Sequence, residues 1–363
     1  MLKLPLLARE CVREHGGGVL ETRQLVLSFK ILQLADLHFT GNPSHPCRNP
    51  PTSLVNAGVP CTEVLTAKFV NALLDLEQPD FVVFSGDNVE TFSPETHQAA
   101  IDAMTQGVED RKIPFAAIFG NHDDESGFPR EKILEMVMEK CKSYTQRGPT
   151  SVDGVGNYQV SVHAPATGRW GQTGSPVLQI YFLDSGGYPN RTTYPDVHML
   201  YDWIKPNQVA FYRELSLAAQ KDPQEPPNPA IMFFHIPLQE YNYDAAVDGN
   251  LVNGSKNEEV SSSNIPSELF SALVERNEVK ATFAGHDHGN DYCLKRQGVQ
   301  LCYGGGGGLG QAYGLADFSR RARVIEWSVN YKNERTIKTW KRLFDDLDQK
   351  YGEQVLFTQV TED

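Results

Sequence analysis

The chain has 363 residues, of which 40% are hydrophobic, so it can bury a large core as one α/β domain or as a domain with an appendage. Its 33 basic and 46 acidic residues give a formal net charge of -13, which argues against a protein that holds nucleic acid by neutralising phosphates. No apolar run of about 18 residues or more occurs, so we expect no membrane span.

The first half of the chain alternates between strand and helix patterns. Leu25–Leu34 predicts a first strand, and the segment Thr40–Pro60, dense in Pro, Asn and Ser, predicts a long loop after it. From Thr62, a favourable N-cap residue, apolar residues recur at helical spacing until Pro79 stops the pattern. The same order then repeats and indicates βαβ units, with a strand over Phe81–Phe84, a helix near Pro94–Asp110, a strand over Ile113–Phe119 and a helix over Pro129–Lys142.

The second half predicts a more mixed arrangement. Tyr158–His163 and Val177–Leu183 are strand patterns joined by a glycine-rich loop, which indicates an antiparallel pair. The further expected elements are a helix over Pro206–Ala219, a strand over Ala230–Phe234, a polar loop over Gln239–Asn264, a helix near Pro266–Arg276, a strand over Val279–Ala284, and two strands, Val324–Val329 and Thr336–Leu343, that finish the sheet. We expect one domain over residues 25–345, an N-terminal extension over 1–24 and a C-terminal tail over 346–363.

Four of the six cysteines form candidate disulfides. Cys293 and Cys302 flank a predicted hairpin that turns at Gln297-Gly298. Counted outward from that turn, the two cysteines face each other as a non-hydrogen-bonded pair, whose Cα atoms approach to about 4.5 Å, at the near edge of disulfide geometry. We predict this bridge. Cys47 and Cys61 bracket a Pro-rich loop and form a second candidate pair.

The cellular compartment is left open between two alternatives. Cys11 and Cys141 have no evident partner, and buried free thiols of a cytosolic enzyme are the alternative to disulfides. The triplets that begin at Asn190 and Asn253 are glycosylation acceptors, which together with the cysteines favour a secreted or endomembrane protein. The apolar stretch Met1–Leu7 is too short for a convincing signal peptide, which keeps a cytoplasmic location as the alternative.

Five apolar runs of strand length stop at a Gly or directly at Asp, Asn or His, so polar side chains that can bind metal collect at one edge of a sheet. A single Asp-x-His arises by chance, and a lone His near an apolar strand is more often structural than a ligand. An ordered set of such motifs is hard to explain in that way. The motifs are, in chain order, Asp36-Leu37-His38, Gly86-Asp87-Asn88, Gly120-Asn121-His122-Asp123, His235 and Gly285-His286-Asp287-His288.

This order of motifs resembles the pattern of the calcineurin-like metallophosphoesterase superfamily: D-x-H, G-D-x-x, G-N-H-D/E, a later H and G-H-x-H. Every block is present between Leu34 and His288. The extended first and last blocks resemble the purple-acid-phosphatase-like branch. Purple acid phosphatases proper carry Gly where this chain has His38, and Tyr where it has Glu90. That Tyr gives the colour with ferric iron, so we expect a protein that is not purple.

The resemblance implies a four-layer α/β/β/α sandwich, in which two mixed β-sheets flanked by helices hold a dinuclear metal centre at the strand ends. It implies that Asp87 bridges two ions, the first held by Asp36, His38, Asp87 and His288 and the second by Asp87, Asn121, His235 and His286. Carboxylate, amide and imidazole ligands without thiolate suit two divalent or mixed-valence ions of manganese, iron or zinc. Two such cations, about 3.5 to 4 Å apart, lower the pKa of a bridging water, and the resulting hydroxide attacks phosphorus.

Further roles are expected for residues beside these ligands. His122 is expected to act as the general acid for the leaving oxygen, or as a donor to the phosphoryl group that it contacts together with Asn121. Asp123 or another nearby carboxylate would orient it. The alternative is that His122 only hydrogen-bonds its own loop. Asn88, next to the bridging ligand, either supports that ligand or has a plain turn role.

Gly304–Gly308 is a run of five glycines without the Lys and Ser/Thr of a phosphate-binding loop. We expect it to border the mouth of the active site, with a tight structural crossing as the alternative.

The function expected from this resemblance is hydrolysis of phosphate esters by a metal-activated hydroxide. Monoesters are favoured, and the partner is then a phosphorylated small molecule or a phosphoprotein. A phosphodiesterase, a protein phosphatase on the same site and a non-catalytic metal-binding relative are the alternatives. The loops that would choose a substrate carry no recognisable motif, and the sequence predicts neither the substrate nor the oligomeric state.

Overall fold

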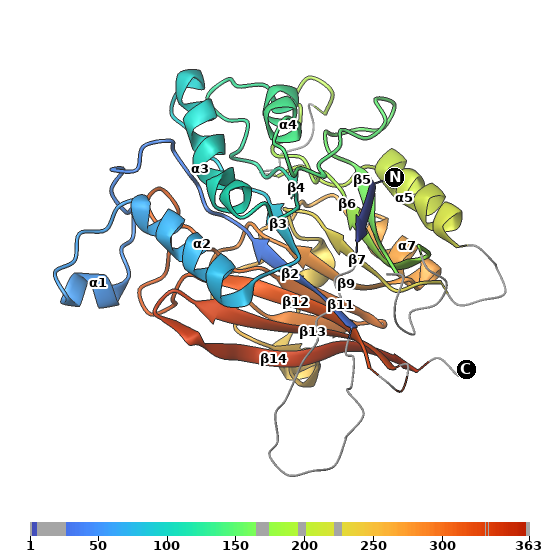
Figure 1. Ribbon diagram of the computed structural model, residues 1–363. Helices are drawn as coiled ribbons and strands as arrows, with labels where there is room; N and C mark the ends of the chain where they lie inside the picture. Colours follow the sequence, from blue (N-terminus) through green and yellow to red (C-terminus); the bar gives the residue numbers. More distant parts are fainter. Residues whose placement is uncertain are drawn as a thin grey trace, which may run out of the picture.

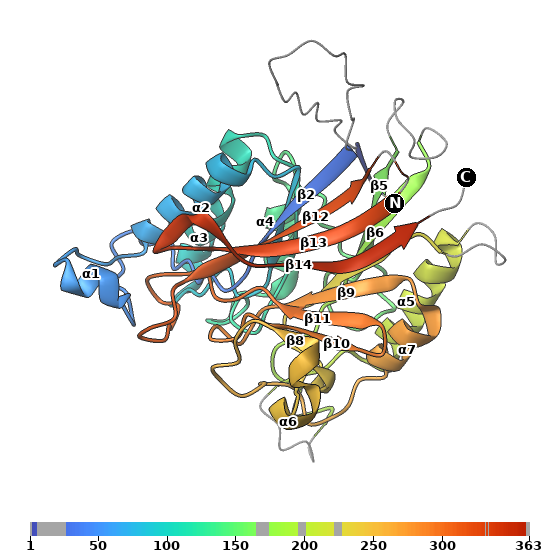
Figure 2. The same ribbon diagram turned by 90° about the horizontal axis from the view of Figure 1, so that it is seen from below.

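The computed structural model describes residues 2–5, 27–164, 174–194, 201–220, 227–330, 332 and 334–360. Two mixed β-sheets pack face to face, and helices cover the outer face of each, so the layers follow the order helix, sheet, sheet, helix (Figures 1 and 2). This arrangement confirms the expected fold class, a four-layer α/β sandwich.

The first sheet has six strands. They are β2 (Leu27–Leu34), β3 (Phe81–Ser85), β4 (Phe115–Ile118), β12 (Arg321–Val329), β13 (Glu334–Leu343) and β14 (Asp346–Val360). Their order is β14-β13-β12-β2-β3-β4, and β2, β3 and β4 run parallel. The helices that cover this sheet are α2 (Val64–Glu77), α3 (His97–Asp110), which continues from the 3-10 turn η1 (Pro94–Thr96), and α4 (Arg130–Met138).

The second sheet has eight strands. They are β1 (Leu2–Pro5), β5 (Tyr158–His163), β6 (Pro176–Phe182), β7 (Ala230–Phe233), β8 (Val252–Asn253), β9 (Val279–Ala284), β10 (Cys293–Arg296) and β11 (Val299–Tyr303). Their order is β1-β5-β6-β7-β9-β11-β10-β8, with β6, β7, β9 and β11 parallel. Helices α5 (Pro206–Ala219) and α7 (Leu269–Arg276) pack on it, and the short elements are α1 (Thr52–Asn56), α6 (Ala245–Asp248), η2 (Gln239–Tyr241) and η3 (Gly249–Leu251).

Strand β2 shows how the core is divided. Phe29 and Ile31 belong to the cluster between the two sheets, whereas Leu32 and Leu34 belong to the cluster under α2, α3 and α4. Both faces of the strand carry buried apolar residues, which are most closely spaced in its second half, Ile31–Leu34. The first polar residues after the strand therefore lie at the edge of the sheet, where the chain leaves the core.

The C-terminal segment corrects one expectation. Residues 346–360, expected as a tail, form β14, which pairs antiparallel with β13. The sheet therefore does not finish with the strand that ends at Leu343. As an edge strand, β14 has mostly exposed or half-buried side chains. Its sequence therefore contains no apolar run that would have predicted a strand. Within the expected N-terminal extension, Leu2–Pro5 form β1, which pairs with β5. The domain boundaries stay predictions.

The start of α2 is a smaller correction. Its N-cap position is occupied by Glu63 and not by Thr62, and no side chain caps the helix there. The Glu63 carboxylate instead accepts hydrogen bonds from the backbone N–H of Thr40, at 2.6 Å, and from its hydroxyl, at 2.7 Å. A long-range contact to the loop after β2 has therefore replaced the local cap that the sequence suggested.

Both predicted disulfides are present. Cys293 and Cys302 face each other across β10 and β11 with 4.0 Å between their Cα atoms, and Cys47 and Cys61 are bridged with 5.4 Å between theirs. Cys141 is a free, exposed thiol. Cys11 lies outside the described residues. The pairing that the hairpin register predicted is thus confirmed.

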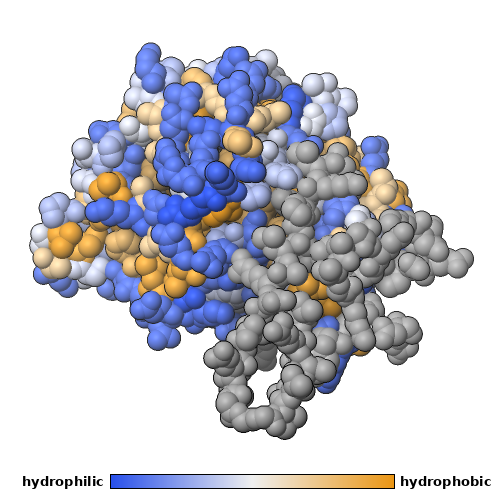
Figure 3. Space-filling model, viewed as in Figure 1, coloured by the Kyte–Doolittle hydropathy of each residue, from blue (hydrophilic) through white to orange (hydrophobic). Residues whose placement is uncertain are grey.

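The face shown in Figure 3 is mostly hydrophilic, and hydrophobic residues interrupt it on the side of α1 and α2. The exposed apolar side chains of these helices and their flanks are Val55, Val59, Val64 and Leu76. Scattered exposed apolar residues are ordinary on a globular surface and do not by themselves indicate a binding site. Among the described residues, no helix has the length and apolar character needed to cross a bilayer.

Candidate metal centre

The motif residues follow the ends of strands β2, β3, β4, β7 and β9. Asp36 and Asp87 come two residues after β2 and β3, and these neighbouring strands are parallel, so both carboxylates leave the first sheet at the same edge. His235 and His286 likewise come two residues after the parallel neighbours β7 and β9 of the second sheet. Because the two sheets pack face to face, these strand ends bring ligands from both sheets together.

One group of side chains consists of Asp36, His38 and His288, all buried. The Nε2 atoms of the two histidines lie 3.1 Å apart, and Nε2 of His288 lies 3.5 Å from Oδ1 of Asp36. The other ring nitrogen of each histidine already has an acceptor. Nδ1 of His38 lies 2.7 Å from Oε2 of Glu90, and Nδ1 of His288 lies 2.9 Å from the carbonyl oxygen of Tyr313.

The second group consists of Asp87, His235 and His286, also buried. Nε2 of His235 lies 3.0 Å from Oδ2 of Asp87, and Nδ1 of the same ring lies 3.0 Å from the carbonyl oxygen of Ser85. The rings of His235 and His286 are 5.2 Å apart. The backbone N–H of His286 donates to Asp36, so the two groups adjoin each other.

These side chains present several unshared electron pairs inward. In the neutral state, donation from Nδ1 to Glu90, to the Tyr313 carbonyl and to the Ser85 carbonyl leaves a lone pair on Nε2 of each of the three histidines for a metal ion. Within the described residues, two further buried atoms of the site have no hydrogen-bond partner: Oδ1 of Asn121 and Nε2 of His286. Buried polar atoms are rarely left unpaired in folded proteins. A pair of cations fits this donor set.

Burial favours the neutral form of two of the site histidines, His286 and His38. Burial lowers the pKa of His286 to about 3. Burial also lowers the pKa of His38, although its hydrogen bond to Glu90 acts in the other direction. Neutral imidazole is the form that coordinates metal, so both rings are in the state that a ligand requires.

Backbone conformation at the site is unusual. Asp36, His38, Asp87 and His286 have positive φ angles of 56°, 48°, 49° and 77°, although none of them is Gly. Such conformations cost free energy and cluster at functional sites, where the surrounding structure imposes them. Four of the seven expected ligands are therefore held in backbone conformations that an unconstrained chain would avoid.

Two glycines of the motifs are required by close packing. A Cβ atom on Gly120 would lie 2.6 Å from Nε2 of His235, and one on Gly285 would lie 2.9 Å from Oδ2 of Asp36. Side-chain atoms do not approach so closely. The glycines that precede Asn121 and His286 thus make room for ligands that come from other strands.

His122 lies beside the first group and has two acidic neighbours. Its ring centre is 5.3 Å from that of His38, and its Nδ1 atom is 2.9 Å from Oε2 of Glu125 and 4.0 Å from Oε1 of Glu90. Burial acts to lower the pKa of His122, but the hydrogen bond to Glu125 and the charges of Asp87 and Glu90 outweigh it and raise the pKa to about 10. The ring is therefore in a position to donate a proton from Nε2.

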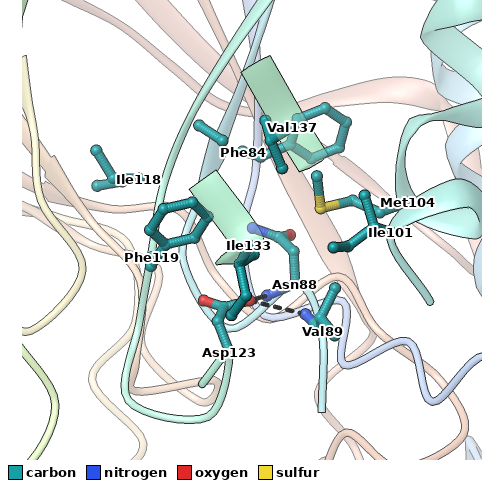
Figure 4. Close-up of a pocket in the computed structure, with 11 residues that line it drawn as sticks. Phe84, Asn88, Val89, Ile101, Met104, Ile118, Phe119, Asp123, Ile133 and Val137 are labelled. Atoms are coloured by element: carbon teal, nitrogen blue, oxygen red, sulfur yellow. Dashed lines mark hydrogen bonds between the residues drawn. The ribbon is translucent and has the colours of Figure 1, made fainter. Parts of the chain in front are cut away.

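Of the carboxylates expected to orient His122, Asp123 is not the one that contacts its ring. Its carboxylate accepts backbone N–H groups from Asp87 at 2.8 Å, Val89 at 2.9 Å and Gly120 at 2.6 Å, and it makes no described contact with the His122 ring. Figure 4 shows it bonded to Asn88 and Val89. Asp123 ties the loop after β4 to the loop after β3, and Glu125 is the carboxylate that orients His122.

Asn88 has the turn role that the sequence left open. Its side-chain amide donates to the carbonyl oxygen of Gly86, at 3.1 Å, and its side chain lines an apolar cavity behind the site (Figure 4). The cavity is lined mainly by aliphatic and aromatic residues, including Phe84, Met104 and Val137. It lies on the core side of the Asp123 loop and presents no further polar cluster of its own.

The glycine run is a tight crossing and does not border an open mouth. Gly304–Gly308 are all buried, and the N–H groups of Gly307 and Gly308 donate to the carbonyl oxygens of Ala35 and Asp36. A Cβ on Gly306 would lie 2.7 Å from Cβ of His288. The run packs against the backbone that carries the first ligands, as in the tight crossing that the sequence left as the alternative.

Four residues of the site carried no assigned role in the sequence argument. Glu125 could have been noticed as the third acid in a row after His122, and Glu90 stands at a motif position but gave no hint that it would contact His38. Tyr313 stacks on the His288 ring, 3.8 Å between ring centres, and donates its hydroxyl to Glu258. Tyr188 donates its hydroxyl to Glu125 and accepts from Asn121, both at 3.2 Å.

Comparison with known proteins agrees with this geometry. The calcineurin-like phosphoesterase family profile matches residues 29–290, a span that contains all seven expected ligands. The chain belongs to the calcineurin-like phosphoesterase family. It is 36% identical over 334 residues to the probable inactive purple acid phosphatase 29 of Arabidopsis thaliana, which covers 87% of this chain and 82% of that protein. The expected purple-acid-phosphatase-like branch is therefore confirmed.

One further relative and one solved structure are informative. The phosphatase DCR2 of Saccharomyces cerevisiae is 35% identical over 332 residues, which cover 87% of this chain and 54% of that protein, so the chain spans about half its length. The crystal structure of a dimetal phosphatase from Danio rerio has a TM-score of 0.54 at 13% identity and covers 90% of this chain and 98% of that one. That likeness supports the fold.

Proposed function

We propose that this phosphoesterase-family protein is a dimetal-dependent hydrolase of phosphate esters, with monoesters as the favoured class. The observation that supports it most directly is the convergence of buried donor atoms with no hydrogen-bond partner. In this proposal, the ligands of the first ion are Asp36, His38, Asp87 and His288, and those of the second are Asp87, Asn121, His235 and His286. Manganese, iron and zinc suit the donor set.

When bound, a pair of cations supplies Lewis-acid polarisation of the phosphoryl group and lowers the pKa of water. The chain supplies the proton for the leaving group. Glu125 holds Nδ1 of His122, which leaves Nε2 to donate its proton to the ester oxygen as the P–O bond breaks. Asn121 is proposed to contact the phosphoryl group through its amide, which Tyr188 already positions. Water provides the oxygen that replaces the leaving group on phosphorus.

The test begins with elemental analysis of protein purified without chelator, followed by turnover of p-nitrophenyl phosphate and of bis-p-nitrophenyl phosphate. We expect about two metal ions per chain and faster hydrolysis of the monoester. His122→Ala should keep both ions and lose turnover by about 10²- to 10⁴-fold. A metal-loaded protein that hydrolyses neither ester, nor any member of a wider phosphoester panel, would contradict the proposal.

A non-catalytic, metal-binding role is the second candidate, and the names of relatives favour it: three plant homologues are called probable inactive purple acid phosphatases. Two residues that purple acid phosphatases carry, a Gly and a Tyr, are His38 and Glu90 here. In this chain they contact each other, 2.7 Å between Nδ1 and Oε2, so the replacement pair completes the site. That contact supports a complete metal site, which both candidates require, and turnover by the metal-loaded protein decides between them.

We also propose a secreted or endomembrane location. The two disulfides suit an oxidising compartment, and both glycosylation acceptors, Asn190 and Asn253, are exposed. Treatment of protein from a eukaryotic host with an N-glycosidase should reduce its mass. An unchanged mass, together with reactive thiols at all cysteines, would indicate the cytoplasm.

A further inference from the structure

Two tyrosines adjoin the second group of ligands. Tyr188 is 51% exposed and hydrogen-bonds Asn121 and Glu125 through its hydroxyl. The half-buried Tyr201 packs at a right angle against His286, 4.4 Å between ring centres. The two tyrosine rings are nearly parallel to each other, with 25° between their planes and 6.1 Å between their centres. Both therefore lie on residues assigned to the second ion.

The tyrosines are also connected to the proton donor. Glu125 accepts from Tyr188 with Oε1 and contacts His122 with Oε2, so a single carboxylate joins the two side chains. A leaving group that takes its proton from Nε2 of His122 departs on the side of the ring away from Glu125. Tyr188 contacts both Glu125 and Asn121, so its exposed ring lies next to the donor and to a ligand of the second ion.

The negative charge around the site disfavours leaving groups that carry negative charge of their own. Glu90, Glu125 and Glu258 surround the ligands and the donor. In the part of the chain that the structure describes, no hydrogen bond or ion pair joins a lysine or an arginine to the seven ligand side chains or to His122. Arg130, which donates to the carbonyl oxygen of Gly120, forms ion pairs with Asp124 and Asp184. A leaving group with additional negative charge would be repelled.

Resting on the proposed function, we propose that Tyr188 and Tyr201 form an aromatic platform that selects phosphate monoesters whose leaving group carries a planar aromatic ring and no further negative charge. Offset stacking or edge-to-face contact on exposed tyrosines favours planar rings over saturated ones of similar size. The metal ligands would treat every monoester alike, so this choice belongs to the two tyrosines.

The platform is tested by binding, apart from turnover. The probes are benzylphosphonate and (cyclohexylmethyl)phosphonate, which cannot be hydrolysed and differ in ring planarity, titrated into metal-loaded protein by calorimetry. We expect benzylphosphonate to bind the native protein about 3- to 10-fold more tightly. Tyr201→Leu should remove this preference and Tyr201→Phe should keep it. A third probe, (4-carboxybenzyl)phosphonate, should bind more weakly than benzylphosphonate because of its extra charge.

The matched control is Tyr194→Leu, since Tyr194 lies on the same segment but packs against Trp203 and not against a ligand. It should leave the preference unchanged. Equal binding of the two rings to the native protein, or a preference that survives in the Tyr188→Leu/Tyr201→Leu double variant, would overturn the platform. Hydrolysis of benzyl and cyclohexylmethyl phosphate is measured alongside. Absence of both activities with an intact binding preference would overturn the proposed function alone.

Discussion

Nδ1 of His122 lies 2.9 Å from Oε2 of Glu125, three residues along the chain. Because this contact occupies Nδ1, only Nε2 of His122 can face a substrate. It also holds the His122 ring next to the metal ligands without making it one of them. The sequence suggested this orienting role for Asp123 or another nearby carboxylate. Glu125 is the residue in contact, while Asp123 holds two loops together.

Glu125→Gln should lower kcat by about 10-fold with unchanged metal content, because the amide no longer stabilises the protonated ring. The loss should be larger for alkyl phosphates than for p-nitrophenyl phosphate, whose leaving group needs little protonation. Steady-state kinetics on both esters measure this difference. Glu139→Gln, an exposed change at the end of α4, is the control. An equal loss on both esters would remove Glu125 from proton donation.

Glu90→Gln should weaken metal binding by about 10- to 100-fold, because the carboxylate fixes the tautomer of His38 and increases the basicity of its Nε2. Competition with a chromogenic chelator measures the affinity. Glu95→Gln, on the exposed turn before α3, should have no effect. Native affinity in the Glu90 variant would show that His38 needs no support from this residue.

Glu77 should make stability depend on pH. Burial raises the pKa of Glu77, but hydrogen bonds from Trp340 and Arg342 and the charge of Lys30 outweigh it and hold the pKa below its ordinary value of 4.5. The ionised carboxylate therefore stabilises the fold above pH 4.5, and this contribution is lost as the pH falls through the lowered pKa.

Glu77→Gln should accordingly lower the free energy of unfolding by about 2 kcal/mol at neutral pH, since two buried or half-buried cations lose their counter-charge. The difference from the native protein should shrink below pH 4.5. Urea unfolding of chelator-treated protein across this range measures it. Asp75→Asn, which removes an exposed partner of Arg111, should change little at any pH. A difference that grows in acid would contradict the sign.

The Cys47–Cys61 bridge joins cysteines 14 residues apart in sequence and lies against the segment that follows the glycine run, where Gly310 donates its N–H to the Cys47 sulfur. Changing both cysteines to serine should lower the free energy of unfolding by about 3 kcal/mol. Denaturant unfolding of the double variant gives this value, with Cys141→Ser as the control for loss of a free thiol. No loss of stability would mean that the bridge does not form in solution.

Removal of residues 346–363 should expose the whole edge of β13, which pairs with β14 from Glu334 to Leu343. Unpaired edges associate with other chains. We expect oligomers or aggregates in light scattering, with the fold otherwise retained. A variant that lacks only residues 361–363 should behave like the native protein.

The sequence determined the strand ends that carry the ligands, because runs such as Phe81–Phe84 are buried on both faces and the polar residue that follows has to leave the core. It also determined the Cys293–Cys302 pair, since a two-residue turn fixes the register of a hairpin. Both features depend on residues that are close together along the chain, so the sequence alone is enough to predict them.

Only the tertiary structure decided the contacts between distant segments. Three relationships depend on where whole loops lie. Glu90 pairs with His38, Glu125 and not Asp123 contacts His122, and Tyr188 and Tyr201 approach the second group of ligands. The same holds for β14, whose polar sequence makes a strand because β13 offers it an edge. No periodic pattern in the sequence predicts these contacts. They depend on how loops are placed and oriented in the folded chain, and the sequence pattern does not fix either.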